Sequence, residues 1–266
     1  MLEPLPPVQP PQYSGSPYAR GLPARAALDW LRAGWDDFRA APGKSLLYGA
    51  LITLLCYVTL AVLHSAGMLY LALPATAGFL IIAPLFALGL YQRSRRRAEG
   101  KRTTIWQMLT LRPAAGSQVL FAGLMLALLV LSWLRTADLL YALFFGLAPF
   151  PGAADALTNV LTTPRGWMML VCGIGLGGLF AAFAFSIALF SFPIMLTENR
   201  DALTAMGLSF AMTNRNLGPC LLWGAIVMAG MILSVATALI GLAVIFPVLG
   251  YGTWHAFRAV DTGHRA

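Results

Sequence analysis

The sequence predicts an all-α membrane protein with six transmembrane helices in three pseudo-repeats, each an interfacial amphipathic helix followed by a helical hairpin. Three observations predict this fold class: an apolar composition, long uncharged runs, and basic residues gathered beside the ends of those runs. Of the 266 residues, 59% are apolar and 11% are charged, whereas a soluble domain has about 25% charged residues. A soluble fold of this composition would lack polar cover for its surface.

The predicted transmembrane domain covers residues 25–260, between two cytoplasmic tails at 1–24 and 261–266. The first 23 residues hold seven of the 17 prolines. That composition is typical of a disordered segment with polyproline II character. It contains no apolar core, so we expect no signal peptide there.

Six apolar runs are long enough to cross a bilayer, which takes about 20 residues as a helix. The stretch Leu217–Phe257 would be about 60 Å long as one helix, so we expect two helices with a tight turn near Ser234–Gly241. Five spans would put the chain ends on opposite sides, and six are favoured. The segment 135–166 either extends the third span or lies on the outer surface as a lid. The spans are expected at about 46–63, 69–91, 119–134, 167–196, 218–236 and 239–257.

Positive charge indicates the orientation. Of the 18 Lys and Arg residues, 16 fall on one side of these spans, and only Arg135 and Arg165 fall on the other. Basic residues near short loops remain in the cytoplasm. The pattern predicts a multi-pass membrane protein with both termini cytoplasmic. It also accounts for the net charge of +8, so no nucleic-acid partner is expected.

An internal repeat accompanies the charge pattern. Gly43, Gly116 and Gly218 align in register before the first, third and fifth spans. We expect them in turns, where glycine takes a positive φ without steric cost. The second helix of each hairpin contains a proline, which removes a backbone donor and is expected to kink the helix. These kink prolines are Pro84, Pro193 and Pro247.

An amphipathic segment precedes each aligned glycine. In the first, Leu28, Leu31, Trp35 and Phe38 share one predicted face. In the second, Thr103 or Thr104 is the expected N-cap, and in the third Asp201 is. Such helices lie among lipid headgroups or pack along the mouth of a bundle.

Few residues suggest chemistry. The cores of the predicted spans hold no ionisable side chain, and we find no nucleophile–base pair, cofactor motif or metal-ligand spacing. Gly173, Gly175 and Gly178 match a dinucleotide pattern formally, but their apolar context favours helix packing. Acids such as Asp36 and Asp37 are interpreted as solvated ion pairs. The polar residues at depth are expected to bond to backbone or between helices: Thr53, Thr59, Ser186, Ser191, Ser234 and Thr237.

Four stretches resemble a bacterial family of predicted integral membrane proteins catalogued as a domain of unknown function. They are Gly34–Pro42, the Pro84–Tyr91 exit with its arginine run, Arg215–Pro219 and Gly252–Arg258. The resemblance covers roughly residues 25–260. It implies an inner-membrane protein of about six spans and brings no activity, cofactor or catalytic residue.

The expected function is that of a non-catalytic accessory or scaffold protein, not an enzyme, whose cytoplasmic face contacts lipid headgroups or a partner subunit in the bilayer. The alternative is a facilitator or exporter of a small apolar or lipid-like solute. The candidate interaction face comprises Trp35, Phe38, Arg39, Arg93, Arg95, Arg96, Arg97 and Arg215.

Overall fold

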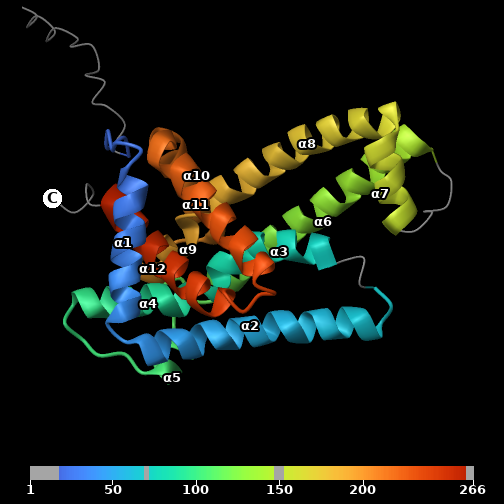
Figure 1. Ribbon diagram of the computed structural model, residues 1–266. Coiled ribbons are helices and arrows are strands. Elements are labelled where there is room, and N and C mark those ends of the chain that lie inside the picture. Colours follow the sequence, from blue (N-terminus) through green and yellow to red (C-terminus); the bar gives the residue numbers. More distant parts are fainter. Residues whose placement is uncertain (1–17, 69–71, 147–152, 262–266) are drawn as a thin grey trace, which may run out of the picture.

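The computed structural model describes residues 18–68, 72–146 and 153–261, which form α-helices and no strand (Figure 1). In chain order the helices are α1 (Ala26–Arg39), α2 (Pro42–Ser65), α3 (Ala72–Phe86), α4 (Leu88–Ala98), α5 (Ile105–Leu109), α6 (Gln118–Phe145), α7 (Ala153–Thr162), α8 (Pro164–Ala188), α9 (Ser191–Thr197), α10 (Ala202–Arg215), α11 (Leu217–Ala236) and α12 (Leu242–Asp261). The predicted all-helical class is therefore confirmed, and the predicted proline-rich tail lies outside the described residues.

Four helical segments of the described chain are long and apolar enough to cross a membrane: Pro42–Ser65, Gln118–Phe145, Pro164–Thr197 and Leu217–Ala236. They contain four of the six expected spans. The other two expected spans correspond to α12 and to α3 with the start of α4, which are not among these candidates. Six crossings and the pseudo-repeat remain predictions. The expected turn between the last two helices is present, because α11 ends at Ala236 and α12 begins at Leu242.

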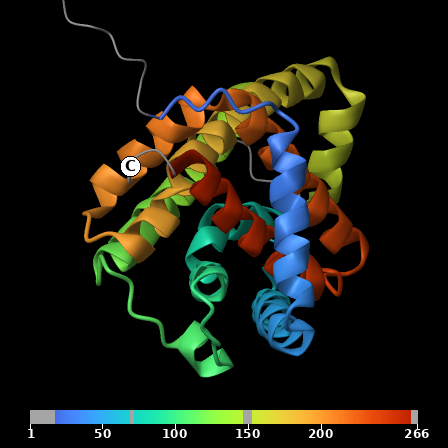
Figure 2. The same ribbon diagram turned by 90° about the vertical axis from the view of Figure 1, so that its left-hand side faces the viewer.

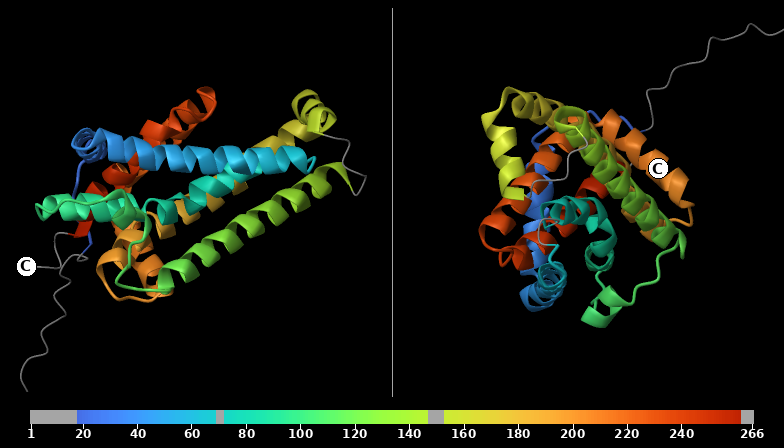
Figure 3. Two further views of the ribbon diagram at one scale, coloured as in Figure 1. Left: turned by 90° about the horizontal axis from the view of Figure 1, so that it is seen from below. Right: turned by 90° about the vertical axis from the view of Figure 1, so that its right-hand side faces the viewer.

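The molecule has a packed end and a spread end. At the left of Figure 1, α1 packs on α12, which also packs on α2 and α4. From there α2 and α8 diverge toward the right of the same view, where α7 joins α6 to α8. Figure 2 shows the packed end face-on, and Figure 3 shows α2 and α6 extending away from it. Large apolar side chains on the spread helices are exposed, as lipid-facing surfaces are, including Leu54, Val58, Leu128, Leu131, Val171 and Ile174.

The two ends of the described chain meet at the packed end. The Arg20 Nε donates to the Val260 carbonyl at 2.9 Å, and Asn216 Nδ2 donates to the Tyr18 carbonyl at 2.7 Å. Tyr18 and Arg20 therefore lie against the start of α11 and the end of α12.

Helix starts follow the predicted caps. The Thr104 side chain accepts from the Gln107 backbone N–H at 3.2 Å, and the Gln107 side-chain oxygen accepts from the Thr104 backbone N–H at 3.1 Å. Asp201 accepts from the Thr204 N–H at 2.9 Å. Thr104 rather than Thr103 is therefore the cap of α5, and Asp201 is confirmed as that of α10.

The expectation for the aligned glycines was correct at one position only. Gly116 has a φ of +57° in the turn before α6. Gly43 and Gly218 instead lie in the first turns of α2 and α11, with helical backbone that needs no glycine. Helix begins earlier there than predicted because Pro42 and Pro219 are favourable in a first helical turn.

Two of the three prolines lie next to a break in a helix. Pro84 is inside α3, three residues before the break at Ala87 that separates α3 from α4. Pro193 follows the break that separates α8 from α9 at Leu189 and Phe190. Pro247 lies inside the continuous helix α12.

The segment 135–166 partly extends a span. Residues up to Phe145 continue α6, and α7 follows within it. A Cβ placed on Gly177 of α8 would lie 3.0 Å from the Trp133 ring of α6, so the glycine-rich stretch packs these two helices together. Gly173, where an added Cβ would lie 3.5 Å from Leu140, also faces α6, whereas a Cβ on Gly175 or Gly178 would meet no atom within 4 Å.

Candidate functional site: a buried polar cluster and an apolar cavity

Asp37 is the centre of a polar cluster at the packed end. Its Oδ2 accepts from the Ser94 hydroxyl and lies 2.9 Å from His255 Nε2. Its Oδ1 is paired with the Arg97 guanidinium. The carboxylate thereby joins α1 to α4 and α12. The interpretation of Asp37 as a solvated acid was wrong, because its side chain is buried between these helices.

Arg93 forms the second half of the cluster. Its guanidinium donates to the Ser45 hydroxyl at 2.9 Å, to the Tyr251 hydroxyl and to the Asp37 carbonyl at 3.2 Å. It also lies over the Tyr251 ring, 5.0 Å from the ring centroid. A buried guanidinium costs free energy unless its donors are satisfied, and these contacts provide partners from α1, α2 and α12.

The electrostatics of the cluster favour the ionised carboxylate. Burial alone would raise the pKa of Asp37, but hydrogen bonds from His255 and Ser94, charge interaction with His255 and the hydrogen bond from Arg97 lower it below its usual value of 3.8. Asp37 is therefore an anion at neutral pH. The cluster has a structural role in joining helices, because both carboxylate oxygens of Asp37 are hydrogen-bonded or ion-paired to other residues of the protein.

The predicted interaction face divides into buried and exposed members. Arg93 and Phe38 are buried, which corrects their assignment to that face. Arg39 lies over the Trp35 ring at 5.1 Å, and Trp35 is 37% exposed. The other exposed or half-buried members are Arg95, Arg96, Arg97 and Arg215.

The division on α4 follows from helix geometry. Positions 93 and 97 are separated by four residues and share a face, so Arg93 and Arg97 point toward Asp37. Arg95 lies on another face, where it pairs with Glu99 at 3.3 Å. Four arginines within five residues cannot all face one partner. Arg215 ends α10 and has no hydrogen bond or ion pair to α4 within the described segments.

The buried face of α1 was also assigned wrongly. Trp30, Gly34 and Phe38 are buried, whereas Leu28 and Trp35 are exposed. A Cβ on Gly34 would meet the Val248 carbonyl of α12 at 2.4 Å, so α1 approaches α12 along this face. The missed signal is the spacing i, i+4, i+7, i+8 from Trp30, which includes Asp37.

Polar side chains at depth behave as predicted. Each donates its hydroxyl to a backbone carbonyl three or four residues earlier in the chain, as in Thr53 to Gly49 at 3.0 Å. The other five are Thr59, Ser186, Ser191, Ser234 and Thr237. Within the described ranges no group of three or more His, Cys, Asp or Glu side chains could hold a metal ion.

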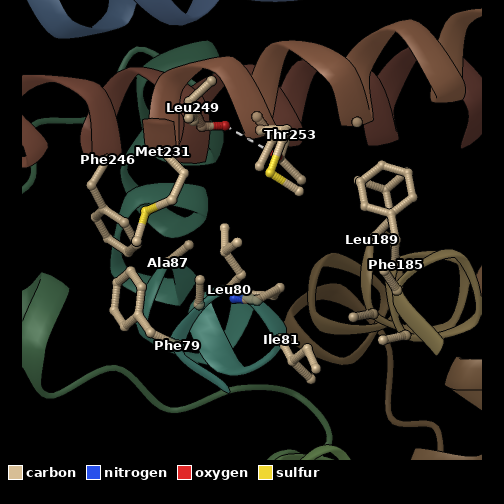
Figure 4. Close-up of a pocket in the computed structure, with 18 of the residues that line it drawn as sticks. Phe79, Leu80, Ile81, Ala87, Phe185, Leu189, Met231, Phe246, Leu249 and Thr253 are labelled. Atoms are coloured by element: carbon tan, nitrogen blue, oxygen red, sulfur yellow. Dashed lines mark hydrogen bonds between the residues drawn. The ribbon is translucent and has the colours of Figure 1, made fainter. Parts of the chain in front are cut away.

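An apolar cavity of about 370 Å³ lies between α3, α8, α11 and α12. In Figure 4, Phe79, Leu80 and Ile81 of α3 lie on one side of it, Leu249 and Thr253 of α12 lie above, and Phe185 and Leu189 lie to the right. Trp133, Phe180, Trp223, Met228, Met231 and Phe246 also line it. This volume is within the range of roughly 300–1,000 Å³ for ligand pockets. Sequence reasoning missed it, because it forms between helices distant along the chain.

The comparisons with known proteins agree with this architecture. Residues 72–197 match DUF2189, a family described as predicted integral membrane protein. No curated protein and no solved structure matches the chain. The matched segment covers α3 through α9. The protein is therefore a membrane-embedded helical protein, and its activity must be inferred from its own residues.

Proposed function

We propose that this chain, whose residues 72–197 belong to the DUF2189 family of predicted integral membrane proteins, is a non-catalytic accessory protein of the bacterial inner membrane. Its packed end would face the cytoplasm and bind anionic lipid headgroups. One observation supports this most: exposed basic residues gather on the packed end, where α1, α4 and α10 lie near the two ends of the described chain.

The chemistry of that end suits a headgroup region. The exposed Trp35 ring beneath Arg39 combines an aromatic residue with a cation, a pairing favoured at the membrane interface. Each Arg near an anionic surface contributes about 1 kcal/mol of attraction. The buried Asp37 cluster would hold α1 and α4 in place, so that the basic side chains are presented on a rigid surface.

A matched pair of variants tests the proposal. Arg95→Gln with Arg215→Gln removes two cations from the packed end, and Arg135→Gln with Arg165→Gln removes two from the opposite end. Arg95 and Arg135 are both in exposed ion pairs at 3.3 Å, which makes the comparison even. Spin-labelled phosphatidylglycerol and phosphatidylcholine report which lipid the reconstituted protein prefers.

We expect the wild type to prefer phosphatidylglycerol, and we expect added salt to weaken this preference through screening. The first variant should reduce the preference and the second should keep it. Equal preference in all three proteins would contradict headgroup binding. A protein that copurifies from native membrane with the wild type and the second variant, but not with the first, would instead assign this end to a partner subunit.

The apolar cavity supports the second candidate function, transport of an apolar or lipid-like solute. Among the described residues, none that line it is charged, so ion coupling through it is not expected. Transport by an aqueous path requires water to reach Ser234, which lines the cavity. A Ser234→Cys thiol, in a chain with its three cysteines replaced by alanine, should then react with aqueous reagents. Full protection would exclude such a path.

A further inference from the structure

We infer that the cavity between α3, α8, α11 and α12 binds an acyl chain of a bilayer phospholipid, which enters between α8 and α11. This site is separate from the basic surface of the proposed function, and it stands whether or not headgroups bind there.

The cavity lining is mostly apolar, which suits a hydrocarbon ligand. Its side chains that carry a polar atom are Tyr91, Trp133, Trp223, Ser234 and Thr253. The Trp223 indole donates to the Thr253 hydroxyl at 3.2 Å, and that hydroxyl donates to the Leu249 carbonyl at 2.9 Å. The Ser234 hydroxyl donates to Gly230 at 2.8 Å. Trp223, Thr253 and Ser234 thus bond within the protein, and most of the remaining lining is apolar, so a polar ligand would lose most of its own hydrogen bonds on entering.

Contacts between α8 and α11 indicate where a chain can enter. The two helices come together at Gly224, where an added Cβ would lie 3.4 Å from the Phe185 ring. This contact and the Trp223–Thr253 bond lie near the start of α11. One turn further along α11, Met228 lines the cavity and is also 47% exposed. The cavity is thus closed toward the packed end and reaches the surface beyond it.

The surface at this opening faces hydrocarbon. Leu179 on α8 and Ile232 on α11 are exposed, and both lie on segments apolar enough to cross a membrane. A cavity that opens on such a surface meets acyl chains at far higher concentration than any free apolar solute. Water is a poor occupant of the cavity, because a mostly apolar lining offers it few hydrogen-bond partners. An acyl chain is therefore the occupant that the surroundings supply.

Fluorescence quenching tests occupancy directly. Trp223 and Trp254 are both buried, but only Trp223 lines the cavity. Two single-tryptophan chains, each with the other six tryptophans changed to phenylalanine, are reconstituted in phosphatidylcholine brominated at the middle of its acyl chains. Bromine quenches by contact. We expect loss of Trp223 fluorescence and little loss for Trp254; equal quenching of the two, or none at Trp223, would overturn the inference.

A filling variant provides a second measurement that keeps the native tryptophans. Val227→Trp places a ring in the cavity, and Val235→Trp places the same ring at an exposed position of α11 outside it. Native mass spectrometry of each full-length protein, delipidated and then exposed to phosphatidylcholine, gives the fraction carrying lipid. We expect that fraction to fall several-fold for Val227→Trp only. An equal bound fraction in both variants would refute the cavity as the binding site.

Discussion

Asp37 is the residue whose loss should most weaken the packed end. Asp37→Asn removes the charge that Arg97 and His255 face, whereas Arg93 keeps its hydrogen bond to the backbone carbonyl of residue 37. Breaking such a cluster costs on the order of 2–4 kcal/mol. Asp36→Asn, one residue away on the exposed side of α1, should change stability by less than about 0.5 kcal/mol. Thermal unfolding in detergent measures both, and equal losses would contradict the assigned role.

The acidity of Asp37 predicts a pH dependence. Its folded-state pKa is lowered below 3.8, so its contribution to stability is fully present above about pH 4 and is lost as pH falls through the folded pKa. The stability difference between wild type and Asp37→Asn should therefore be constant near neutral pH and shrink below pH 4. A difference that grows on acidification would mean that the folded-state pKa is raised instead.

The sequence could indicate Asp37 as a residue on the α1 face toward α12, but not its partners. Ser94 lies 57 residues away and His255 lies 218 away. Periodicity reports which side of one helix is apolar. It carries no information on which distant helix will cover that side, and two apolar faces on α1 allowed the wrong one to be chosen.

Among the helical elements, the best-predicted parts were those governed by length and hydropathy. The expected span 218–236 corresponds to α11, and 46–63 falls within α2. The prediction of one continuous helix over 69–91 was wrong, because the helix breaks at Ala87, three residues after Pro84. Proline leaves a backbone carbonyl one turn earlier without its hydrogen bond. The residue at which the helix then breaks depends on tertiary packing rather than on the local sequence.

Close helix approach predicts the effect of a methyl group at Gly49. A Cβ there would lie 2.0 Å from the Ala243 carbonyl oxygen, so α2 and α12 would have to separate. We expect Gly49→Ala to cost about 1–3 kcal/mol through overpacking. Gly207 lies within α10 with open space around it, so Gly207→Ala should stabilise by about 0.5–1 kcal/mol. Stabilisation by both changes would show that α2 and α12 do not touch at Gly49.

The turn between α11 and α12 predicts a stabilising change. Ala238 has a φ of +49°, in the left-handed region that favours glycine. Ala238→Gly should relieve this conformation and stabilise by about 0.5–1 kcal/mol. Ala236→Gly, at the last helical residue of α11, should instead destabilise by up to about 1 kcal/mol. Opposite signs for neighbouring alanines in a denaturation assay would support the turn, and the same sign would count against it.

In the whole molecule, the contrast between a packed end and diverging arms was beyond sequence reasoning. Charge and hydropathy distinguish the two ends, because each is a local property of the residues. The angles between helices depend on where glycines permit contact and where large rings hold helices apart. The cavity arises from such spacing, with the Trp133 and Phe180 rings tilted against each other beside it and their centroids 5.5 Å apart.

The placement of the chain ends predicts membrane topology. Arg20 donates to the Val260 carbonyl at 2.9 Å, so we expect both ends of the described chain to lie on one side of the membrane and the number of crossings to be even. The basic residues of that side predict that it is cytoplasmic. A phosphatase reporter that is active only in the periplasm should be inactive when fused after Ala266. The same reporter fused after Gly146, which follows the end of α6 away from the packed end, should be active. Activity of both fusions would contradict the placement of Gly146 and the C-terminus on opposite sides of the membrane, and the reversed pair would invert the proposed orientation.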